Sequence, residues 1–359
     1  MTITEPQILK ALGVVQDPDL HRDIVSLGFV KNIKIEGEKI SFDVELTTPA
    51  CPVKDLLREQ CVREVKKLKG VKEVAVHMTS RVRSQVNTDL EPLKQVKNII
   101  AVASGKGGVG KSTVAVNLAL ALSKTGAKVG LMDCDIYGPS VPMMLAITER
   151  PGVIGQKVIP VEKLGLKVIS MGLLASDDTP VIWRGPMVAG ILQQFLAQVE
   201  WGTLDYLVMD LPPGTGDAQL TLAQKAPISG AIIVTTPQDV SLLDARRGLK
   251  MFQQVNVPVL GIVENMSYFI CDQCSKKHTI FKTGGGGKVA KELNLSLLGE
   301  IPLDTKVAEG GDSGLPIVHA FPDSEVGEAY ILLAGKVAAL LSILSEGKQT
   351  DPSALHLKW

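Results

Sequence analysis

The chain has 359 residues, which is long enough for two domains and a sizeable hydrophobic core. Its 38 Lys and Arg residues balance 38 Asp and Glu residues, which argues against a globally basic nucleic-acid-binding protein. From this balance we expect no nucleic-acid partner. The sequence opens without a signal-peptide pattern, and Lys336 interrupts its longest apolar run, so we expect no membrane partner either. Five cysteines, an odd number, favour a reducing, cytoplasmic compartment over a disulfide scaffold.

Residues 1–85 have the pattern of a small α+β domain. Thr4 and Gln7 match a capping box for a first helix, and Glu36-Gly37-Glu38 separates two alternating segments that predict a β-hairpin. The predicted order is a helix to about residue 12, strands at 29–35 and 40–46, a helix at 53–68 and a strand at 71–77. A polar stretch follows, in which residues 86–96 are predicted to form a linker.

Two cysteines of this domain receive different interpretations. Cys61 shares a helical face with Leu57 and Val65, which predicts a buried core thiol. Cys51 precedes the second helix, whose N-terminus would favour a thiolate, so Cys51 is a candidate accessory thiol. The alternative is a structural loop thiol held between two prolines.

The turn Asp17-Pro18-Asp19 and the run Thr48-Pro49-Ala50-Cys51-Pro52 resemble the small domain of MIP18-type iron–sulfur assembly factors. In that family the domain is often fused ahead of Mrp-type ATPases. The resemblance implies an MIP18-like domain at residues 1–85.

Residues 99–113 contain the most specific motif of the sequence. An apolar run at 99–103 predicts a strand, Gly105 to Ser112 matches G-x-x-x-x-G-K-[ST], and an apolar helical pattern follows. The loop N–H groups and the helix N-terminus would hold nucleotide phosphates, with Lys111 at the β- and γ-phosphates and Ser112 on Mg²⁺. The predicted nucleotide-binding residues of this loop are Gly105, Lys106, Gly107, Gly108, Val109, Gly110, Lys111, Ser112 and Thr113.

Lys106 gives the loop a second lysine, in the run Lys-Gly-Gly-Val-Gly-Lys-Ser-Thr. This run resembles the deviant Walker A loop of the nitrogenase iron protein, MinD/ParA-type ATPases and Mrp/ApbC iron–sulfur carriers. In that class the extra lysine reaches the nucleotide of a partner subunit, so the resemblance implies an ATP-dependent homodimer with Lys106 and Lys111 as catalytic residues. The alternative is a solvated lysine on the loop.

Two predicted strands end in acids that suit Mg²⁺ or water beside a P-loop. The strand at 129–132 precedes Asp133 and Asp135, and the strand at 206–210 ends in Asp210. We predict that Asp210 holds Mg²⁺ through water. In the resembling class the second aspartate of such a D-x-D run is the catalytic one, which points to Asp135 and leaves Asp133 to hold the loop. The run Leu-Pro-Pro-Gly-Thr-Gly-Asp at residues 211–217 resembles the corresponding segment of Mrp-type members.

Asn265 and a cysteine pair follow a predicted strand at 259–263. In the resembling family an asparagine here pairs with the adenine edge, so Asn265 is the candidate base contact, with a turn residue as the alternative. Cys271 and Cys274 have metal-ligand spacing, but two ligands do not complete a tetrahedral site. Three arrangements are open: a [4Fe–4S] cluster bridging two chains, a zinc site completed within one chain by His278 and another group, and a redox dithiol.

Strands alternating with helices predict an α/β fold, a doubly wound, mostly parallel P-loop NTPase sheet at residues 97–345. The glycines at 284–287 predict a flexible hinge, and residues 346–359 a mobile tail. Four motifs of this domain resemble the Mrp/ApbC carriers. The resemblance implies an ATP-hydrolysing iron–sulfur cluster carrier that uses ATP and Mg²⁺, works as a homodimer, and moves a [4Fe–4S] cluster between scaffold proteins and client apoproteins.

Three other functions compete with this interpretation. A MinD/ParA-like positioning ATPase would need a membrane helix or a basic DNA-binding patch, and neither is visible in the sequence. An ATP-dependent scaffold would hold a structural zinc at Cys271 and Cys274. An electron donor like the nitrogenase iron protein would carry its cluster cysteines singly, in separate segments.

Overall fold

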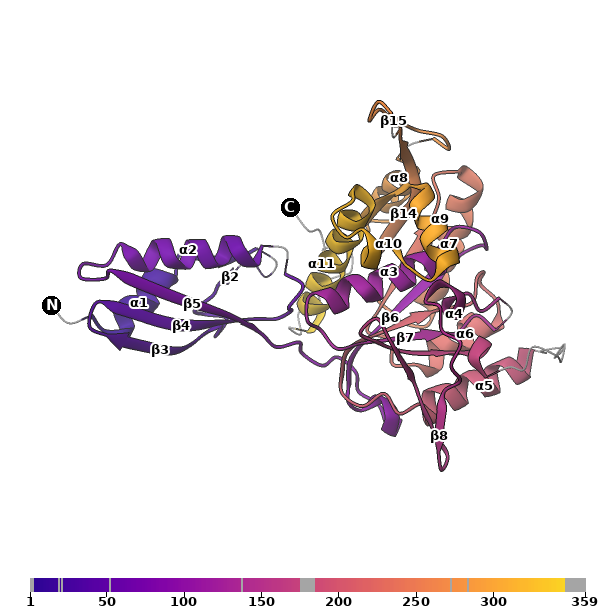
Figure 1. The fold of residues 1–359 in the computed structure, drawn as a ribbon, viewed down its shortest axis with the longest axis horizontal. Helices are drawn as coiled ribbons and strands as arrows, with labels where there is room; N and C mark the ends of the chain where they lie inside the picture. The colour runs from indigo at the N-terminus through magenta and orange to yellow at the C-terminus, as the bar shows by residue number, and fades with distance from the viewer. Residues whose placement is uncertain are drawn as a thin grey trace. The chain divides into compact units, whose positions relative to one another are not determined.

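The structure is a computed structural model that describes residues 3–345, except residues 19, 21, 52, 137, 175–184, 272 and 283 (Figure 1). The predicted tail at 346–359 and two residues of the N-terminal motifs, Asp19 and Pro52, therefore lie outside the described residues. The chain divides into two compact units. Of the described residues, the first unit contains those up to Arg83 together with residues 338–345, and the second contains residues 84–337.

The first unit has the predicted α-β-β-α-β order. Its elements are α1 (Glu5–Leu12), β3 (Val30–Glu36), β4 (Lys39–Leu46), α2 (Lys54–Lys66) and β5 (Glu73–Ser80), with a short ladder of β1 (Gln16–Asp17) and β2 (Arg22–Asp23) that was not predicted. β3 and β4 form the antiparallel hairpin, and α2 carries the chain from β4 to the parallel strand β5. Cys61 is fully buried in the core, and burial raises the pKa of its thiol to about 12, which confirms the predicted core thiol.

The second unit is built on one large sheet, which confirms the predicted fold class. Its strand order is β10-β11-β7-β12-β6-β13-β14-β15, with β16 beside β14, and all neighbours are parallel except the pairs that β10 and β15 make. The strands are β6 (Val96–Ser104), β7 (Val129–Asp133), β10 (Val161–Lys163), β11 (Leu166–Ser170), β12 (Leu204–Asp210), β13 (Gly230–Thr235), β14 (Val259–Ile270), β15 (Lys277–His278) and β16 (Leu297–Leu303). A separate ribbon pairs β8 (Gly152–Ile154) with β9 (Lys157–Ile159).

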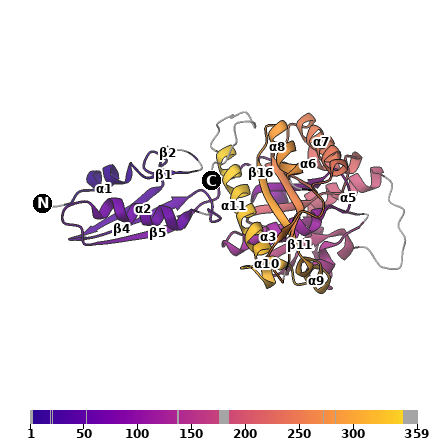
Figure 2. The ribbon, with the colours of Figure 1, turned by 90° about the horizontal axis from the view of Figure 1, so that it is seen from above.

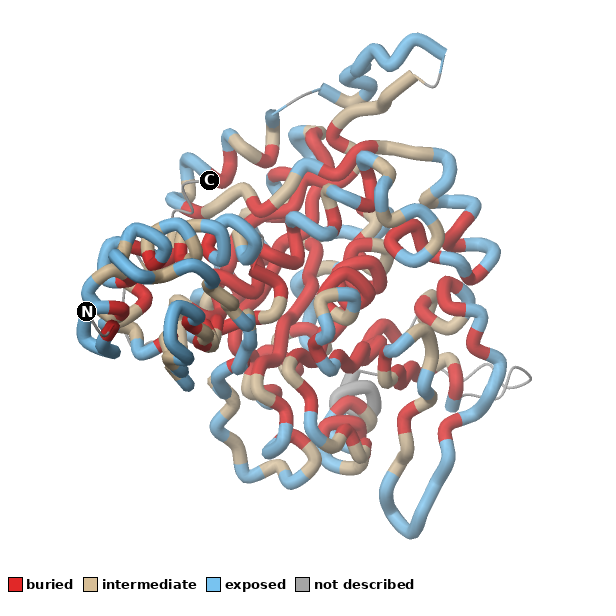
Figure 3. Tube along the Cα trace, turned by 60° about the vertical axis from the view of Figure 1, so that its left-hand side comes forward, coloured by how far each residue is buried: buried red, intermediate tan, exposed pale blue. Residues whose placement is uncertain are grey.

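Helices cover both faces of this sheet (Figure 2). The helices are α3 (Lys111–Lys124), α4 (Val141–Met144), α5 (Gly185–Gln198), α6 (Asp217–Lys225), α7 (Asp239–Gln254), α8 (Gly285–Glu292), α9 (Thr305–Ser313), α10 (Ile317–Ala320) and α11 (Glu325–Ser345), with 3₁₀ turns η1 (Glu91–Leu93) and η2 (Met171–Leu173). The buried residues concentrate along the central strands (Figure 3). Alternate residues of β6, such as Ile99 and Ala101, share one core with residues of α5 to α8. This packing fixes the carboxyl ends of the strands, where the predicted site lies.

Helix α11 is long and apolar enough to cross a membrane by length and composition alone. However, 67% of its apolar window is buried inside the structure, as in the core helix of a soluble domain. Its burial agrees with the sequence-based expectation of a packed helix.

Three segments differ from the sequence-based expectations. β14 continues to Ile270, so Asn265 lies within a strand and not in a turn after it. The glycines at 284–287 begin helix α8, where the Gly286 N–H donates to the buried Glu264 carboxylate, so the expected hinge is wrong. Leu93, inside the stretch expected to be a linker, is fully buried in the core of the second unit.

Candidate functional site

The predicted P-loop joins the end of β6 to the start of α3. Gly108 and Gly110 both have φ +81°, a left-handed conformation that a side chain would strain. A Cβ on Gly105 would lie 2.2 Å from the Asp244 backbone of α7, so this glycine permits close packing of the loop on that helix. Gly108 and Gly110 thus allow the loop to curve, and Gly105 allows it to pack on α7.

The loop forms one wall of a pocket of about 420 Å³. Seven of the nine loop residues predicted to bind nucleotide line it, namely Lys106, Gly107, Gly108, Gly110, Lys111, Ser112 and Thr113, and Asp135 and Asn265 line it too. Gly105 and Val109 are not among the lining residues; Val109 is buried, and its carbonyl oxygen accepts a hydrogen bond from Asn265 Nδ2 at 2.9 Å.

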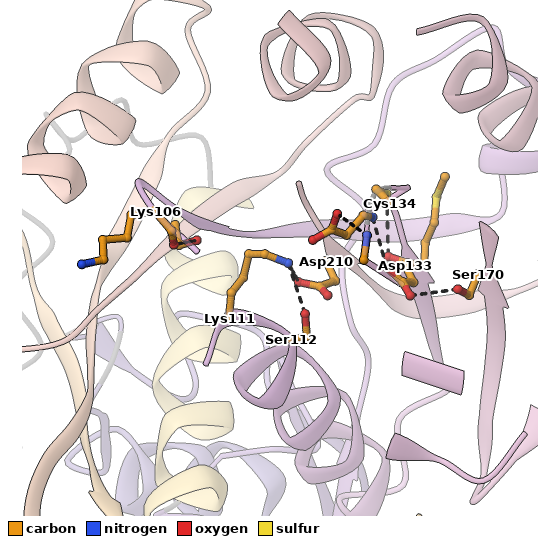
Figure 4. A network of polar contacts seen from close by, with 11 residues as sticks. Lys106, Lys111, Ser112, Asp133, Cys134, Ser170 and Asp210 are labelled. Carbon is orange, nitrogen blue, oxygen red and sulfur yellow. Dashed lines mark hydrogen bonds and ion pairs between the residues drawn. The ribbon is translucent and has the colours of Figure 1, made fainter. Parts of the chain in front are cut away.

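Lys111, which lines the pocket, forms a buried ion pair with Asp210 at the end of β12 (Figure 4). The Lys111 ammonium also donates to Ser112 Oγ at 3.3 Å. Desolvation raises the pKa of Asp210, and the positive charge of Lys111 opposes that rise. One carboxylate oxygen, Oδ1, contacts Lys111, whereas Oδ2 is buried and has no hydrogen-bond partner among the described residues. A buried carboxylate oxygen with unused acceptor capacity beside a serine hydroxyl fits the oxygen ligands that Mg²⁺ and its water molecules require.

The two aspartates after β7 have different surroundings. Asp133 is fully buried; Ser170 Oγ donates to its Oδ2 at 2.8 Å, and the Asp135 N–H donates to its Oδ1 at 3.1 Å. Burial, and then the charge of Asp210, raise the pKa of Asp133 to about 7. Asp135 reaches the pocket, and its Oδ1 accepts from the Gly138 N–H at 3.3 Å. The geometry thus gives Asp133 a loop-holding position and Asp135 the one open to a ligand.

Lys106 is exposed and does not join the Lys111 and Asp210 pair. Its carbonyl oxygen accepts from Ser104 Oγ at 2.9 Å, which anchors the backbone. Figure 4 shows its side chain directed away from Lys111 and Asp210. Within one chain, then, the Lys106 side chain lines the pocket but stays apart from the pair of Lys111 and Asp210.

Asn265 lies where β14 departs from regular geometry. Met266 has φ +55°, and the pairing of β14 with β16 shifts register between Asn265 and Phe269. This irregularity holds Asn265 against the P-loop, 94% buried, with its amide on the Val109 carbonyl. A side chain on Gly110 would collide with that amide, because a Cβ there would lie 2.2 Å from Asn265 Nδ2.

Other pocket residues carry little or no signal in the sequence. Pro302, Leu303 and Asp304 line the pocket at the end of β16. Four apolar side chains from α4 and α9 also line the pocket, namely Met143, Met144, Val307 and Ala308. Nothing in these four residues distinguishes them from ordinary core positions, because only the fold brings α4 and α9 to the P-loop.

Cys271 and Cys274 lie on the hairpin between β14 and β15, which projects from the second unit (Figure 1). The Cys271 N–H donates to the Lys276 carbonyl at 3.1 Å, and the Ser275 N–H donates to the Cys271 carbonyl at 2.8 Å. Cys274 is exposed, Cys271 is half-buried, and the two thiols form no disulfide. Across the described ranges, no third His, Cys, Asp or Glu completes a group that could hold a metal ion. His278 lies on β15 opposite Phe269.

Cys51 belongs to the core of the first unit, with 9% of its surface exposed. It lies two residues before Val53, the N-cap residue of α2, which agrees with the predicted place ahead of a helix. The Ala50 N–H donates to Thr48 Oγ1 at 3.1 Å and shapes this loop. The thiol is therefore buried at a helix start, and in the described part of the chain it belongs to no group of three or more potential metal ligands.

The fold and the pocket together define a P-loop NTPase of the MinD/ParA class. The cell division ATPase MinD of Pyrococcus furiosus has the same fold, at 22% identity and a TM-score of 0.51, over 67% of this chain and 98% of that chain. A nucleotide-binding protein from Archaeoglobus fulgidus, solved with ADP and cobalt, is 40% identical with a TM-score of 0.57, over 62% of this chain and 89% of that chain.

The sequence comparisons define the family within this class. Residues 95–338 match the model of the NUBPL iron-transfer P-loop NTPases, and residues 5–77 match that of the iron–sulfur cluster assembly proteins. The iron–sulfur cluster carrier protein of Synechocystis sp. is 53% identical over 95% of this chain and 99% of its own length. The iron–sulfur cluster carrier protein of Escherichia coli is 44% identical over 94% of this chain and 93% of its own length. The chain belongs to the family of ATP-hydrolysing iron–sulfur cluster carriers, which confirms the class of function that the motifs predicted.

Proposed function

We propose that the P-loop pocket binds Mg²⁺–ATP and that a dimer of the chain holds one [4Fe–4S] cluster between two projecting hairpins. The observation that carries this proposal is the hairpin with Cys271 and Cys274. The hairpin carries two of the four thiolates that such a cluster takes. Among the described residues, no third His, Cys, Asp or Glu joins them as a possible metal ligand. A second copy of the same hairpin supplies the missing pair.

The nucleotide site follows from the pocket. Loop N–H groups and Lys111 hold the phosphates, and the Asn265 amide binds the base edge. Ser112 and Asp210 would hold Mg²⁺, because Asp210 Oδ2 has no hydrogen-bond partner among the described residues and keeps its capacity to accept. Asp135 orients the attacking water. When bound, Mg²⁺ offsets charge on the phosphates.

Lys106 acts in the partner's site. Its exposed side chain, directed away from its own Lys111, crosses the dimer interface and stabilises negative charge on the transferring phosphoryl group of the partner's nucleotide. Closure of the dimer around two nucleotides then changes the separation of the two hairpins. Hydrolysis reverses the change, so cluster affinity differs between nucleotide states.

The cluster is the cargo of this cycle. The chain receives it from an iron–sulfur scaffold protein and delivers it to apoproteins in the cytoplasm. The MIP18-like domain at 1–85, the linker at 86–96 and the ATPase domain at 97–345 divide the work, and Cys51 serves as an accessory thiol in the first of these. The matching family models at 5–77 and 95–338 support this division.

Anaerobic reconstitution with iron and sulfide tests the proposal. We expect about two irons per chain in a dimer, and loss of both the iron and its visible absorption in the Cys271→Ala/Cys274→Ala variant. Cys51→Ala is the matched control and should retain the cluster. Iron that survives in the double variant, or zinc retained without iron, contradicts the bridging cluster.

The coupling is tested separately on the reconstituted dimer. The rate of cluster transfer to a chelator is measured with ATP, with ADP and without nucleotide. Equal rates in the three conditions would show that nucleotide state and cluster affinity are independent.

A further inference from the structure

The three-stranded sheet of the first unit has two edges of different kinds. The β3 edge carries Lys31 and Lys34, shifts register between them and has Asn32 at φ +52°. Lysines and bulges are devices that keep an edge strand from pairing with another chain. β5 has neither device: it contains no lysine or proline and pairs with β4 without a register shift from end to end. Among the strands that the structure describes, none pairs with the other side of β5.

The backbone of β5 offers hydrogen-bonding groups at this open edge. The Arg81 N–H, just after the strand, donates to the Leu46 carbonyl of β4 at 2.8 Å. Because N–H and C=O directions alternate along a strand, the odd-numbered residues of β5 face β4 and the even-numbered ones face outward. Val74, Val76 and Met78 therefore direct their backbone groups toward the open edge.

A groove lies alongside this edge, between β5 and helix α2. It has a volume of about 500 Å³ and an apolar floor of Val62, Val74 and Val76. Its rim carries Arg58, Arg63 and Lys66, opposed by one acid, Glu59.

The rim cations keep most of their charge available to a ligand. Arg58 pairs with Asp55 at 3.1 Å and Arg63 pairs with Glu64 at 3.3 Å, but Arg58 and Arg63 are 50% and 67% exposed. Exposed pairs of this kind contribute little and exchange readily with other anions. The groove is thus apolar at its floor and positive at its rim.

We propose that the β5 edge and this groove form a docking site for an extended acidic segment of a partner protein. The segment adds to the sheet as a fourth strand and bonds the outward N–H and C=O groups of Val74, Val76 and Met78. Its apolar side chains enter the groove, and its carboxylates meet Arg58, Arg63 and Lys66. The site lies in the first unit and is independent of the nucleotide and cluster chemistry.

The test uses the full chain and a fluorescent eight-residue peptide of alternating glutamate and valine. Fluorescence anisotropy should show binding, and the same peptide with lysine in place of glutamate should not bind. The combined variant Arg58→Glu, Arg63→Glu and Lys66→Glu should weaken binding of the acidic peptide by roughly tenfold or more and admit the basic one. The variant Lys31→Glu/Lys34→Glu, at the opposite edge, should leave binding unchanged.

Val76→Pro tests the backbone part of the proposal. It removes an outward N–H that β4 does not use, so the fold should persist while peptide binding is lost. In the wild type, hydrogen exchange followed by NMR should show new protection at Val74, Val76 and Met78 on peptide binding. The proposal would be overturned if the acidic peptide did not bind or if both peptides bound equally. It would also be overturned if binding survived in both the triple rim variant and Val76→Pro. Self-association of the chain that Val76→Pro abolishes would also overturn it, because the occupant would then be a second copy.

Discussion

The three aspartates beside the P-loop show how much a residue's surroundings decide its chemistry. Asp210 has a cation in contact, Asp133 has a hydroxyl and a backbone N–H, and Asp135 opens to the pocket. The sequence places all three at strand ends, but it cannot rank them, because burial and partners come from other strands. Ser170, which holds Asp133, is 37 residues away along the chain.

The raised pKa of Asp133 makes a pH-dependent contribution to stability. The folded value is about 7 against an ordinary value of 3.8, so between these pH values the native state holds a proton that the unfolded chain has released. The stability from the protonated carboxyl is present below pH 4 and is lost as pH rises to 7. Three pKa units correspond to roughly 4 kcal/mol as an upper bound.

We therefore expect Asp133→Asn to abolish this loss. Its unfolding free energy should match that of the wild type below pH 4 and exceed it increasingly toward pH 7.5, because an amide cannot ionise. Urea unfolding at four pH values measures the difference. Parallel curves for the two proteins would contradict the assignment.

Strand β14 is the element that connects the two halves of the site. It presents Asn265 to the P-loop and reaches the cysteine hairpin six residues later. The sequence predicts both residues but ends the strand at Val263, because Glu264-Asn265-Met266-Ser267 has the composition of a turn. The structure accommodates these polar residues inside the strand: Glu264 is fully buried and bonded by Ser267 Oγ at 2.6 Å. Propensity fails here because a buried carboxylate finds its partners in α8 and in its own strand.

Gly110→Ala tests the contact between β14 and the P-loop. The new methyl group would occupy a left-handed backbone position and collide with the Asn265 amide, so both the loop and the strand must shift. We expect nucleotide affinity to fall at least tenfold by calorimetry with ADP. Gly248→Ala in α7, where a Cβ would meet nothing within 4 Å, is the control and should bind as the wild type does.

The base of the cysteine hairpin is tied to helix α11. Tyr268 Oη donates to Glu325 at 3.0 Å, Lys277 Nζ donates to the same carboxylate at 2.8 Å, and the Lys277 ammonium lies 4.4 Å from the centre of the Tyr268 ring. We expect Glu325→Ala to loosen the hairpin and speed cluster loss to a chelator by a few-fold, with unchanged nucleotide affinity. Glu328→Ala, one turn along α11, is the matched control. Identical rates for both variants would show that the hairpin holds itself.

At the scale of the whole molecule, the proposed functional unit is a dimer of this chain. The proposal rests on two features of one chain, the pair of thiols on the hairpin and the Lys106 side chain that points away from Lys111. The sequence predicts this through its resemblance to dimeric ATPases, whereas the fold of one chain supplies only the geometry of each half. The pocket walls from α4 and α9 escape sequence-based prediction for a related reason: they depend on which helices the sheet brings together.

Lys106→Ala separates binding from hydrolysis. The variant keeps Lys111, Ser112 and the loop backbone, so ATP affinity should remain within about threefold, while hydrolysis falls by roughly a hundredfold or more, as when a charge supplied by a partner is removed. ATP-dependent dimerisation, measured by light scattering, should weaken as well.

A mixing experiment decides whether Lys106 acts in the partner's site. Lys106→Ala chains keep Lys111, Ser112 and the loop backbone, and Lys111→Ala chains still present Lys106. A mixture should therefore hydrolyse ATP faster than either variant alone. A mixture as inactive as its components would place Lys106 in its own subunit's chemistry.

The buried pair of Lys111 and Asp210 has a consequence for the order of ligand binding. A phosphate that takes the Lys111 ammonium leaves a carboxylate buried without a counter-charge, and a cation that takes Asp210 leaves an ammonium in the same position. Each ligand alone breaks the pair at a cost, whereas the two together restore a balanced set of charges. Metal and nucleotide should accordingly bind with positive cooperativity, so the site responds to their complex and discriminates against either component alone.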